Sequence, residues 1–198
     1  GTRRVKLLSL TTALLVIDMQ QGFDDHAWGP RNNPAAATTV AALLAAWRAE
    51  KAPIVHVHHD SLAPTGRMRR GSPGNAVKPE ALPLGDEPVC RKSVNSAFIG
   101  TNLESGLRAN GIRSLAIVGL TTNHCISTTA RMAGNLGFDT FVLADATAAF
   151  ARAHLDGPVR PADEVHKAAL SDLQDEFAQV VDTDAVLAAL AARMAAHV

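Results

Sequence analysis

The chain has 198 residues, a length that fits one domain, because chains usually divide only beyond roughly 250 residues. Hydrophobic residues make up 47% of the chain and charged residues 19%, which excludes a largely disordered protein. The 19 basic and 19 acidic residues give a net charge of zero, whereas nucleic-acid and anionic-membrane binders carry a basic excess. We therefore expect a single domain over residues 1–198 and no nucleic-acid or membrane partner.

The cysteine content is low, with only Cys90 and Cys125, so a disulfide framework is not expected. No signal-peptide pattern opens the chain, and no apolar run approaches the roughly 18 residues of a membrane span. These features favour reduced thiols and a cytoplasmic location.

Short apolar runs alternate with helical patterns along the chain. In chain order we expect a strand at 13–18, a helix at 34–50, strands at 53–58 and 88–92, a helix at 101–110, a strand at 114–120, a helix at 125–136, a strand at 139–145, a helix at 161–177, a strand at 179–182 and a last helix from 183. Nearly continuous apolar strands between helices indicate parallel strands that are covered on both faces. We predict an α/β fold, a single doubly wound sheet of six parallel strands in the order 3-2-1-4-5-6.

Local signals refine this scheme. Thr101 and Glu104 have the spacing of a capping box, and Thr183 is placed to cap the last helix. Residues 19–33 and 60–87 have no periodicity, and loops of such length in a compact domain are usually functional or disordered.

Reactive side chains follow several of the predicted strands. Asp18 ends the first strand, Lys92 ends the third, and Cys125 follows the fourth at the start of a helix. Ligands of open α/β sheets bind beyond the carboxyl ends of the strands, although Lys92 must reach inward from an outer strand. A helix N-terminus favours the thiolate of Cys125, and a carboxylate, a cation and a thiol suit acyl transfer. The structural alternatives are a turn-capping Asp18, a solvated Lys92 and a buried, unreactive Cys125.

The histidines suggest a metal site only weakly. His56 and His58 share one face of a strand, but no cluster of carboxylates or cysteines completes a ligand set, so we expect no metal. His59 is expected near the pocket mouth, and His124 is a weaker alternative as the base for Cys125. The chain also lacks the glycine-rich dinucleotide motif, the P-loop and the serine-hydrolase elbow, so no cofactor is predicted.

Three segments carry a family resemblance: TALLVIDMQQGF around Asp18, KSVNSAFIGT around Lys92 and GLTTNHCISTTARMAGNLGFDTFVLADA around Cys125. Over residues 12–182 the chain resembles the isochorismatase-like cysteine hydrolases, with streptothricin hydrolase as one possible relative. The resemblance implies Asp18 as base, Lys92 as cation and Cys125 as nucleophile. It also implies a cis peptide between Leu120 and Thr121, an oxyanion hole formed by the N–H groups of Thr121 and Cys125, and a homodimer or homotetramer.

The resemblance further implies hydrolysis of an amide, lactam, carbamoyl or ureide C–N bond through a thioester. The stretch HHDSLAPTG lacks the downstream histidine of the nicotinamidase metal set, which argues against that activity. We expect a small, largely neutral substrate. The side chains expected around it are Phe23, Trp28, His59, Phe98, Asn123 and His124.

Two other readings stay open at this point. One is hydrolysis of an isochorismate-like vinyl ether by acid catalysis from Asp18, which needs no cysteine but does need basic residues for its anionic substrate. The other is a non-enzymatic redox-sensing or binding protein in which Cys125 is oxidised. A sensor usually has a resolving thiol, and the candidate, Cys90, is expected to be buried in the third strand.

Overall fold

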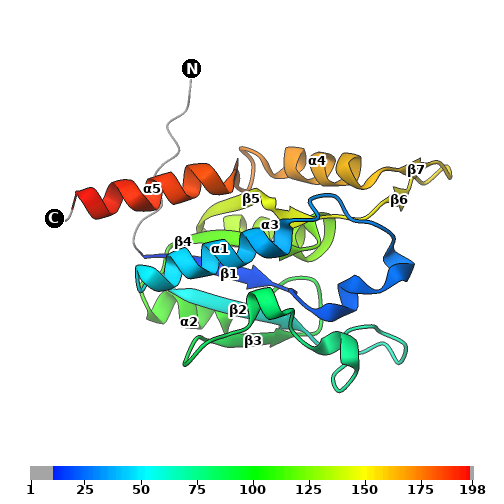
Figure 1. Cartoon of the computed structure of the whole chain (residues 1–198), viewed down its shortest axis with the longest axis horizontal. Coiled ribbons are helices and arrows are strands. Elements are labelled where there is room, and N and C mark those ends of the chain that lie inside the picture. Colours follow the sequence, from blue (N-terminus) through cyan, green and yellow to red (C-terminus); the bar gives the residue numbers. More distant parts are fainter. Residues whose placement is uncertain (1–10, 197–198) are drawn as a thin grey trace.

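The computed structural model describes residues 11–196 and is built around a sheet of six parallel strands. The strands are β1 (Thr12–Ile17), β2 (Ile54–His59), β3 (Val89–Lys92), β4 (Ser114–Leu120), β5 (Asp139–Ala148) and β8 (Gln179–Val181). Their order across the sheet is β3-β2-β1-β4-β5-β8 (Figure 1). The predicted fold class and strand order are therefore confirmed.

Helices cover both faces of this sheet. The α-helices in the described part of the chain are α1 (Ala36–Ala49), α2 (Leu103–Ala109), α3 (Ser127–Asn135), α4 (Ala162–Leu173) and α5 (Thr183–Ala195). α1 and α5 share one apolar core with the sheet, and α2, α3 and α4 share the other. Within residues 11–196, no helix has both the length and the apolar character that crossing a bilayer requires.

Three peripheral segments gather beyond the carboxyl ends of the strands. These are the residues that follow β1, the loop that follows β2, and a hairpin of β6 (Arg152–Ala153) and β7 (Val159–Arg160), which lie at the right of Figure 1. The loop after β2 contains short 3-10 turns at Pro73–Asn75 and Pro79–Ala81. Segments from distant parts of the sequence therefore surround one end of the sheet.

The backbones of β1 and β4 approach closely next to this end. Ile17 pairs with Gly119, whose φ is +121°, a conformation that favours glycine. A Cβ atom on Gly119 would lie 1.9 Å from the carbonyl oxygen of Ile17. The glycine therefore allows the residues after the two strands, Asp18 and Thr121, to lie side by side.

Most helix boundaries lie within two residues of the predictions, and two differ by more. The helix expected at 125 begins earlier, with a π-helical turn at Thr122–Ile126, so Cys125 lies inside its first turn. The helix expected to reach 177 ends at Leu173, because Asp175 adopts a left-handed φ of +65° that interrupts it. The β6–β7 hairpin was not predicted, because each of its strands has only two residues.

The predicted caps are also wrong in detail. Asn102 is the N-cap of α2, and Glu104 bonds Arg108 at 3.0 Å, so the capping box with Thr101 does not form. At the start of α5, Asp182 Oδ1 accepts a hydrogen bond from Ala185 N at 2.8 Å. The hydroxyl of Thr183 donates instead to Asp145, which ties α5 to β5.

Candidate active site

Asp18 follows β1 directly and is fully buried. Its φ is +52°, a left-handed conformation that Asp tolerates better than most residues, and its backbone N–H donates to Val57 O at 2.9 Å. Oδ2 accepts a hydrogen bond from Lys92, whereas Oδ1 is buried and has no hydrogen-bond partner among the described residues. A buried carboxylate oxygen without a partner costs free energy, and it is available to accept a proton.

Lys92 ends β3, and its side chain reaches past β2 to the centre of the sheet. Its Nζ lies 3.0 Å from Asp18 Oδ2, 2.9 Å from His59 Nδ1, 3.0 Å from Val94 O and 3.4 Å from Cys125 Sγ. The Lys92 and Asp18 side chains are both 0% exposed. The inward reach that the sequence left uncertain is therefore present, and Lys92 bridges Asp18 and Cys125.

Cys125 lies in the π-helical turn and is buried beside this pair. Its Sγ is within 4.8 Å of an Asp18 oxygen, and Asn95 Nδ2 lies 3.6 Å from it. Burial, together with the negative charge of Asp18, raises the pKa of the Cys125 thiol to about 12, although Lys92 acts in the opposite direction. The thiolate expected from the helix N-terminus is thus not the resting form, because burial in this site dominates.

His59 completes the surroundings of Lys92. Burial and the nearby Lys92 charge lower the pKa of His59, so Nδ1 of the neutral ring accepts a hydrogen bond from the ammonium. His59, Asp18 and Cys125 also have the spacing of three metal ligands. The Lys92 ammonium contacts all three, and its charge would repel a metal ion bound there. The absence of a metal stays a prediction, and this argument favours it.

Among the described residues, the other histidines of β2, His56 and His58, are not grouped with His59 as metal ligands. His56 Nε2 lies 3.4 Å from Glu87 Oε1, and burial lowers the pKa values of both His56 and His58. Asp60, which follows β2, accepts hydrogen bonds from Arg91, Arg70 and Asn75. Those donors hold the pKa of Asp60 well below its usual range, and they anchor the loop at 60–75 to the sheet.

A cavity of about 500 Å³ opens over these groups. Its lining residues are Asp18, Phe23, Ala27, Trp28, His59, Met68, Asn95, Thr121, Asn123, His124, Cys125, Phe150, Ala151 and Arg152. This volume is within the range of sites for small molecules.

Most of the predicted pocket residues line this cavity, but Phe98 does not. The ring of Phe98 is buried against Phe138, at a centroid distance of 5.8 Å, in the core beneath the sheet. The prediction of Phe98 as a pocket wall is therefore corrected, because an apolar residue near a site can equally face the core. Sequence reasoning missed Met68, Asn95, Phe150 and Arg152. Asn95 was identifiable from its place three residues after Lys92, whereas the others come from distant loops.

Three aromatic rings form one wall of the cavity. Trp28 lies 5.6 Å from Phe23 and 5.4 Å from Phe150, measured between ring centroids. The Arg67 guanidinium lies over the Trp28 ring at 5.1 Å and bonds Asp25 at 2.8 Å. These contacts join the segment after β1 to the loop after β2, so the wall is fixed by tertiary packing.

The turn that carries Cys125 follows a cis peptide between Leu120 and Thr121, as expected. Thr121 and Cys125 both line the cavity, and the Thr121 hydroxyl lies 3.2 Å from His124 Nδ1. Burial and the charge of Arg152 lower the pKa of His124, so this side chain is neutral at neutral pH.

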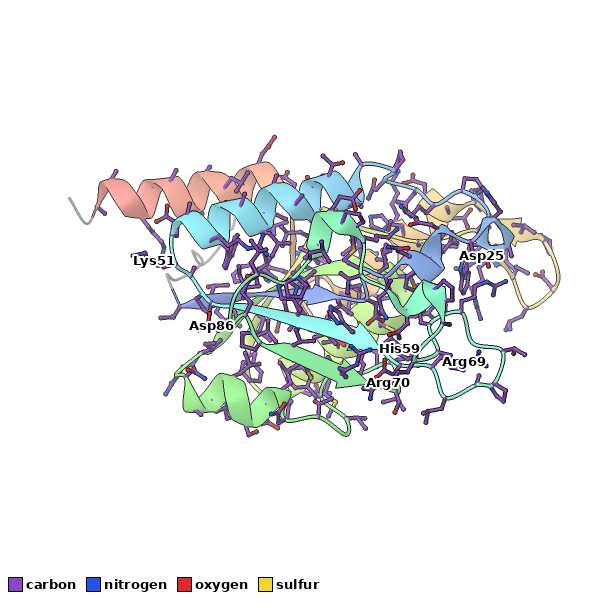
Figure 2. The ribbon with its side chains drawn as sticks, turned by 60° about the horizontal axis from the view of Figure 1, so that its bottom comes forward. Asp25, Lys51, His59, Arg69, Arg70 and Asp86 are labelled. Carbon is purple, nitrogen blue, oxygen red and sulfur yellow. The ribbon has the colours of Figure 1, made fainter. Side chains whose placement is uncertain are left out.

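A larger hollow of about 1030 Å³ lies at the opposite end of the sheet. Lys51 and Asp86, which line it, are far from His59 and Arg70 in Figure 2. Cys90 also lines this hollow, whereas Asp18 and Cys125 line the smaller cavity. Asp18 and Cys125, two of the residues that the sequence predicts for acyl transfer, therefore line the smaller cavity.

Comparisons with known proteins agree with this geometry. The isochorismatase domain family matches residues 12–185. The isochorismatase family protein YrdC of Bacillus subtilis is 42% identical over 175 residues, which cover 88% of this chain and 94% of that protein. The crystal structure of a hydrolase of the isochorismatase family from Chromobacterium violaceum is 44% identical, with a TM-score of 0.93, over 97% of this chain and 100% of that one.

The comparisons also include the relative suggested by the sequence. Streptothricin hydrolase of Streptomyces noursei is 32% identical over 138 residues, which cover 70% of this chain and 50% of that enzyme. From the match over residues 12–185, the shared fold and the similarity to full-length relatives, it follows that this chain belongs to the isochorismatase family of hydrolases.

Proposed function

We propose that the protein is a cysteine-dependent hydrolase that cleaves a C–N bond of a small amide, lactam, carbamoyl compound or ureide through a thioester. The observation that carries this proposal is the position of Lys92 Nζ, 3.0 Å from the Asp18 carboxylate and 3.4 Å from Cys125 Sγ. The three groups supply a base, a cation and a nucleophile in one buried place.

The raised pKa of Cys125 determines how the first step runs. Because the resting sulfur carries its proton, attack on the carbonyl carbon requires the proton to leave as the S–C bond forms. The Asp18 carboxylate is the acceptor, since one of its oxygens lies within 4.8 Å of the sulfur and its Oδ1 is buried with no hydrogen-bond partner among the described residues. The Lys92 ammonium stabilises the negative charge that Asp18 and the sulfur share.

The remaining steps return Asp18 and Cys125 to their starting state. The N–H groups of Thr121 and Cys125 stabilise the oxyanion of the tetrahedral intermediate. Asp18 passes its proton to the leaving nitrogen as the C–N bond breaks, which leaves a thioester on Cys125. A water molecule then gives a proton to Asp18 and attacks the thioester carbon, and the departing sulfur takes that proton back.

The rest of the cavity positions the substrate. Phe23 and Trp28 contribute an apolar wall, Asn123 and His124 offer hydrogen bonds, and His59 holds Lys92 in place. Relatives named nicotinamidase and ureidoacrylate amidohydrolase support amide chemistry. Nicotinamidase activity itself is not proposed, because the stretch HHDSLAPTG lacks the downstream histidine of that metal set. Its carboxylate, Asp60, is also paired with two arginines. The homo-oligomeric state and the cytoplasmic location stay predictions.

Hydrolysis of an isochorismate-like vinyl ether is the alternative. It is favoured by one observation, the basic side chain of Arg152 in the cavity, because such a substrate is anionic. In that reaction Asp18 would protonate the substrate, and Cys125 would not form a covalent bond.

One experiment separates these functions. Wild type, Cys125→Ala and Cys90→Ala are assayed against a panel of amides, lactams, ureides and isochorismate, and quenched reactions are mapped by mass spectrometry. We expect an acyl adduct on Cys125, a loss of at least about 10³-fold in kcat for Cys125→Ala, and retained activity for Cys90→Ala. Full activity of Cys125→Ala on an amide would refute the thioester mechanism, and its full activity on isochorismate alone would establish the alternative.

A further inference from the structure

Among the described residues, Arg152 is the charged residue of the cavity that has no oppositely charged partner. It begins β6, its side chain is exposed, and it lines the cavity together with His124 and Cys125. Among the described residues, its guanidinium has no hydrogen bond and no salt bridge. The acid that lines the cavity, Asp18, is already paired with Lys92. The cavity therefore carries a surplus positive charge on its exposed side, whereas Cys125 is buried.

The neighbouring arginines differ from Arg152 in this respect. Arg31 pairs with Asp24 at 3.2 Å, and Arg67 pairs with Asp25 at 2.8 Å. Each of these side chains has its counter-charge within the chain. Arg152 is thus not one of several interchangeable basic residues around the opening of the cavity.

A second observation concerns the residue directly across the hairpin. Arg152 pairs with Arg160 in the antiparallel ladder of β6 and β7. Directly opposed residues of such a pair have Cβ atoms about 5 Å apart, and like charges there are destabilising. Arg160 Nε is also buried without a hydrogen-bond partner among the described residues. The two guanidinium groups repel each other, and that of Arg160 has a donor without an acceptor. An anion bound between them would reduce the repulsion and accept hydrogen bonds.

We propose that Arg152, supported by the charge of Arg160, binds a carboxylate of the substrate, so that the preferred substrates are small amides or ureides bearing a carboxylate apart from the scissile bond. This inference rests on the proposed hydrolase function and deepens it. A guanidinium binds a carboxylate through two parallel hydrogen bonds, which fixes orientation as well as charge. It differs from the sequence-based expectation of a largely neutral substrate, which stays a prediction.

The neutral state of His124 is consistent with this assignment. His124 lies near Arg152, and its lowered pKa keeps it uncharged, so it can bond the amide part of a substrate without competing for the carboxylate. The aromatic wall of Phe23, Trp28 and Phe150 would then contact the carbon skeleton between the two polar ends.

The first test measures binding without turnover. The reagents are iodoacetamides made from β-alanine, γ-aminobutyrate and 6-aminohexanoate, each as the free acid and as the methyl ester. They alkylate Cys125, and peptide mapping separates this product from alkylated Cys90. For each reagent we compare the alkylation rate of the acid with that of its methyl ester. For at least one of the three chain lengths, we expect this acid-to-ester ratio at Cys125 to be about tenfold above the ratio for a free thiol. The ratio should fall to the free-thiol value in Arg152→Gln and recover in part in Arg152→Lys. Arg69→Gln, an exposed loop arginine that bonds Pro64 O, is the matched control (Figure 2).

The results that would overturn the carboxylate site differ from those that would overturn the proposed hydrolase function. An acid-to-ester ratio in wild type equal to that of Arg152→Gln at every length overturns the carboxylate site, whatever the result with Cys125→Ala. On amide substrates paired as acid and ester, Arg152→Gln should lower kcat/KM at least tenfold for the acids, mainly through KM, and leave the esters unchanged. An equal loss on acids and esters would also overturn the assignment, because it would indicate a structural role.

Discussion

The Lys92 ammonium lies 3.0 Å from the Asp18 carboxylate, although β2 separates the strands that carry these two residues. Both side chains are fully buried, so each charge depends on the other for its stability. The same ammonium contacts Cys125 and His59. The pair therefore places a buried positive and a buried negative charge beside Cys125, and it links β3 to the end of β1 across β2.

Removing Lys92 alone should be strongly destabilising. Lys92→Met leaves the Asp18 carboxylate buried without its partner, and breaking a buried pair in this way costs about 3–5 kcal/mol. Urea unfolding at pH 7 measures the loss. The double variant Asp18→Asn/Lys92→Met should recover most of it, since no buried charge remains. Lys167→Met, which removes an exposed lysine paired with Asp163, should change the free energy of unfolding by less than about 0.5 kcal/mol. A Lys92→Met protein as stable as wild type would contradict the buried ion pair.

The reactivity of Cys125 should depend steeply on pH. With a pKa of about 12, the thiolate is a small fraction at pH 7–8, so iodoacetamide labelling should be slow there and rise about tenfold per pH unit. Asp18→Asn should label faster at a given pH, because the Asp18 charge raises this pKa. Lys92→Met should label more slowly, because the ammonium lowers it. Rates are followed by peptide mapping, which separates Cys90. A wild-type rate that reaches its plateau near pH 8 would rule out the buried, protonated thiol.

Gly119 should not tolerate a side chain. In Gly119→Ala the new Cβ would meet the Ile17 carbonyl oxygen at 1.9 Å, and a φ of +121° is strained for alanine, so β1 and β4 must separate next to Asp18. We expect a loss of at least about 2 kcal/mol in the free energy of unfolding and a parallel loss of activity. Gly106→Ala is the matched control, because Gly106 lies in α2 and an added Cβ there would meet no atom within 4 Å beyond its own helix backbone. This variant should gain up to about 1 kcal/mol in the free energy of unfolding. Equal stability of the two variants would show that the strands adjust without cost.

Single strands and helices were largely predictable, whereas their caps and ends were less so. The six strands follow from apolar runs, and the strand order follows from the rules of doubly wound sheets. The capping box at Thr101 failed because Glu104 pairs with Arg108 instead. Such local choices depend on which partner lies within reach, and a spacing in the sequence does not contain that information.

The sequence by itself determined the fold class, and it pointed to Asp18, Lys92 and Cys125, because periodicity and residue type at strand ends are local properties. Only the tertiary structure decided that Lys92 reaches Asp18, that Cys125 rests as a thiol, that Phe98 faces the core, and that Arg152 lines the cavity. Those features arise from burial and from contacts between segments far apart in the chain. The charge balance of the cavity, and with it the proposed carboxylate of the substrate, therefore becomes visible only once the chain is folded.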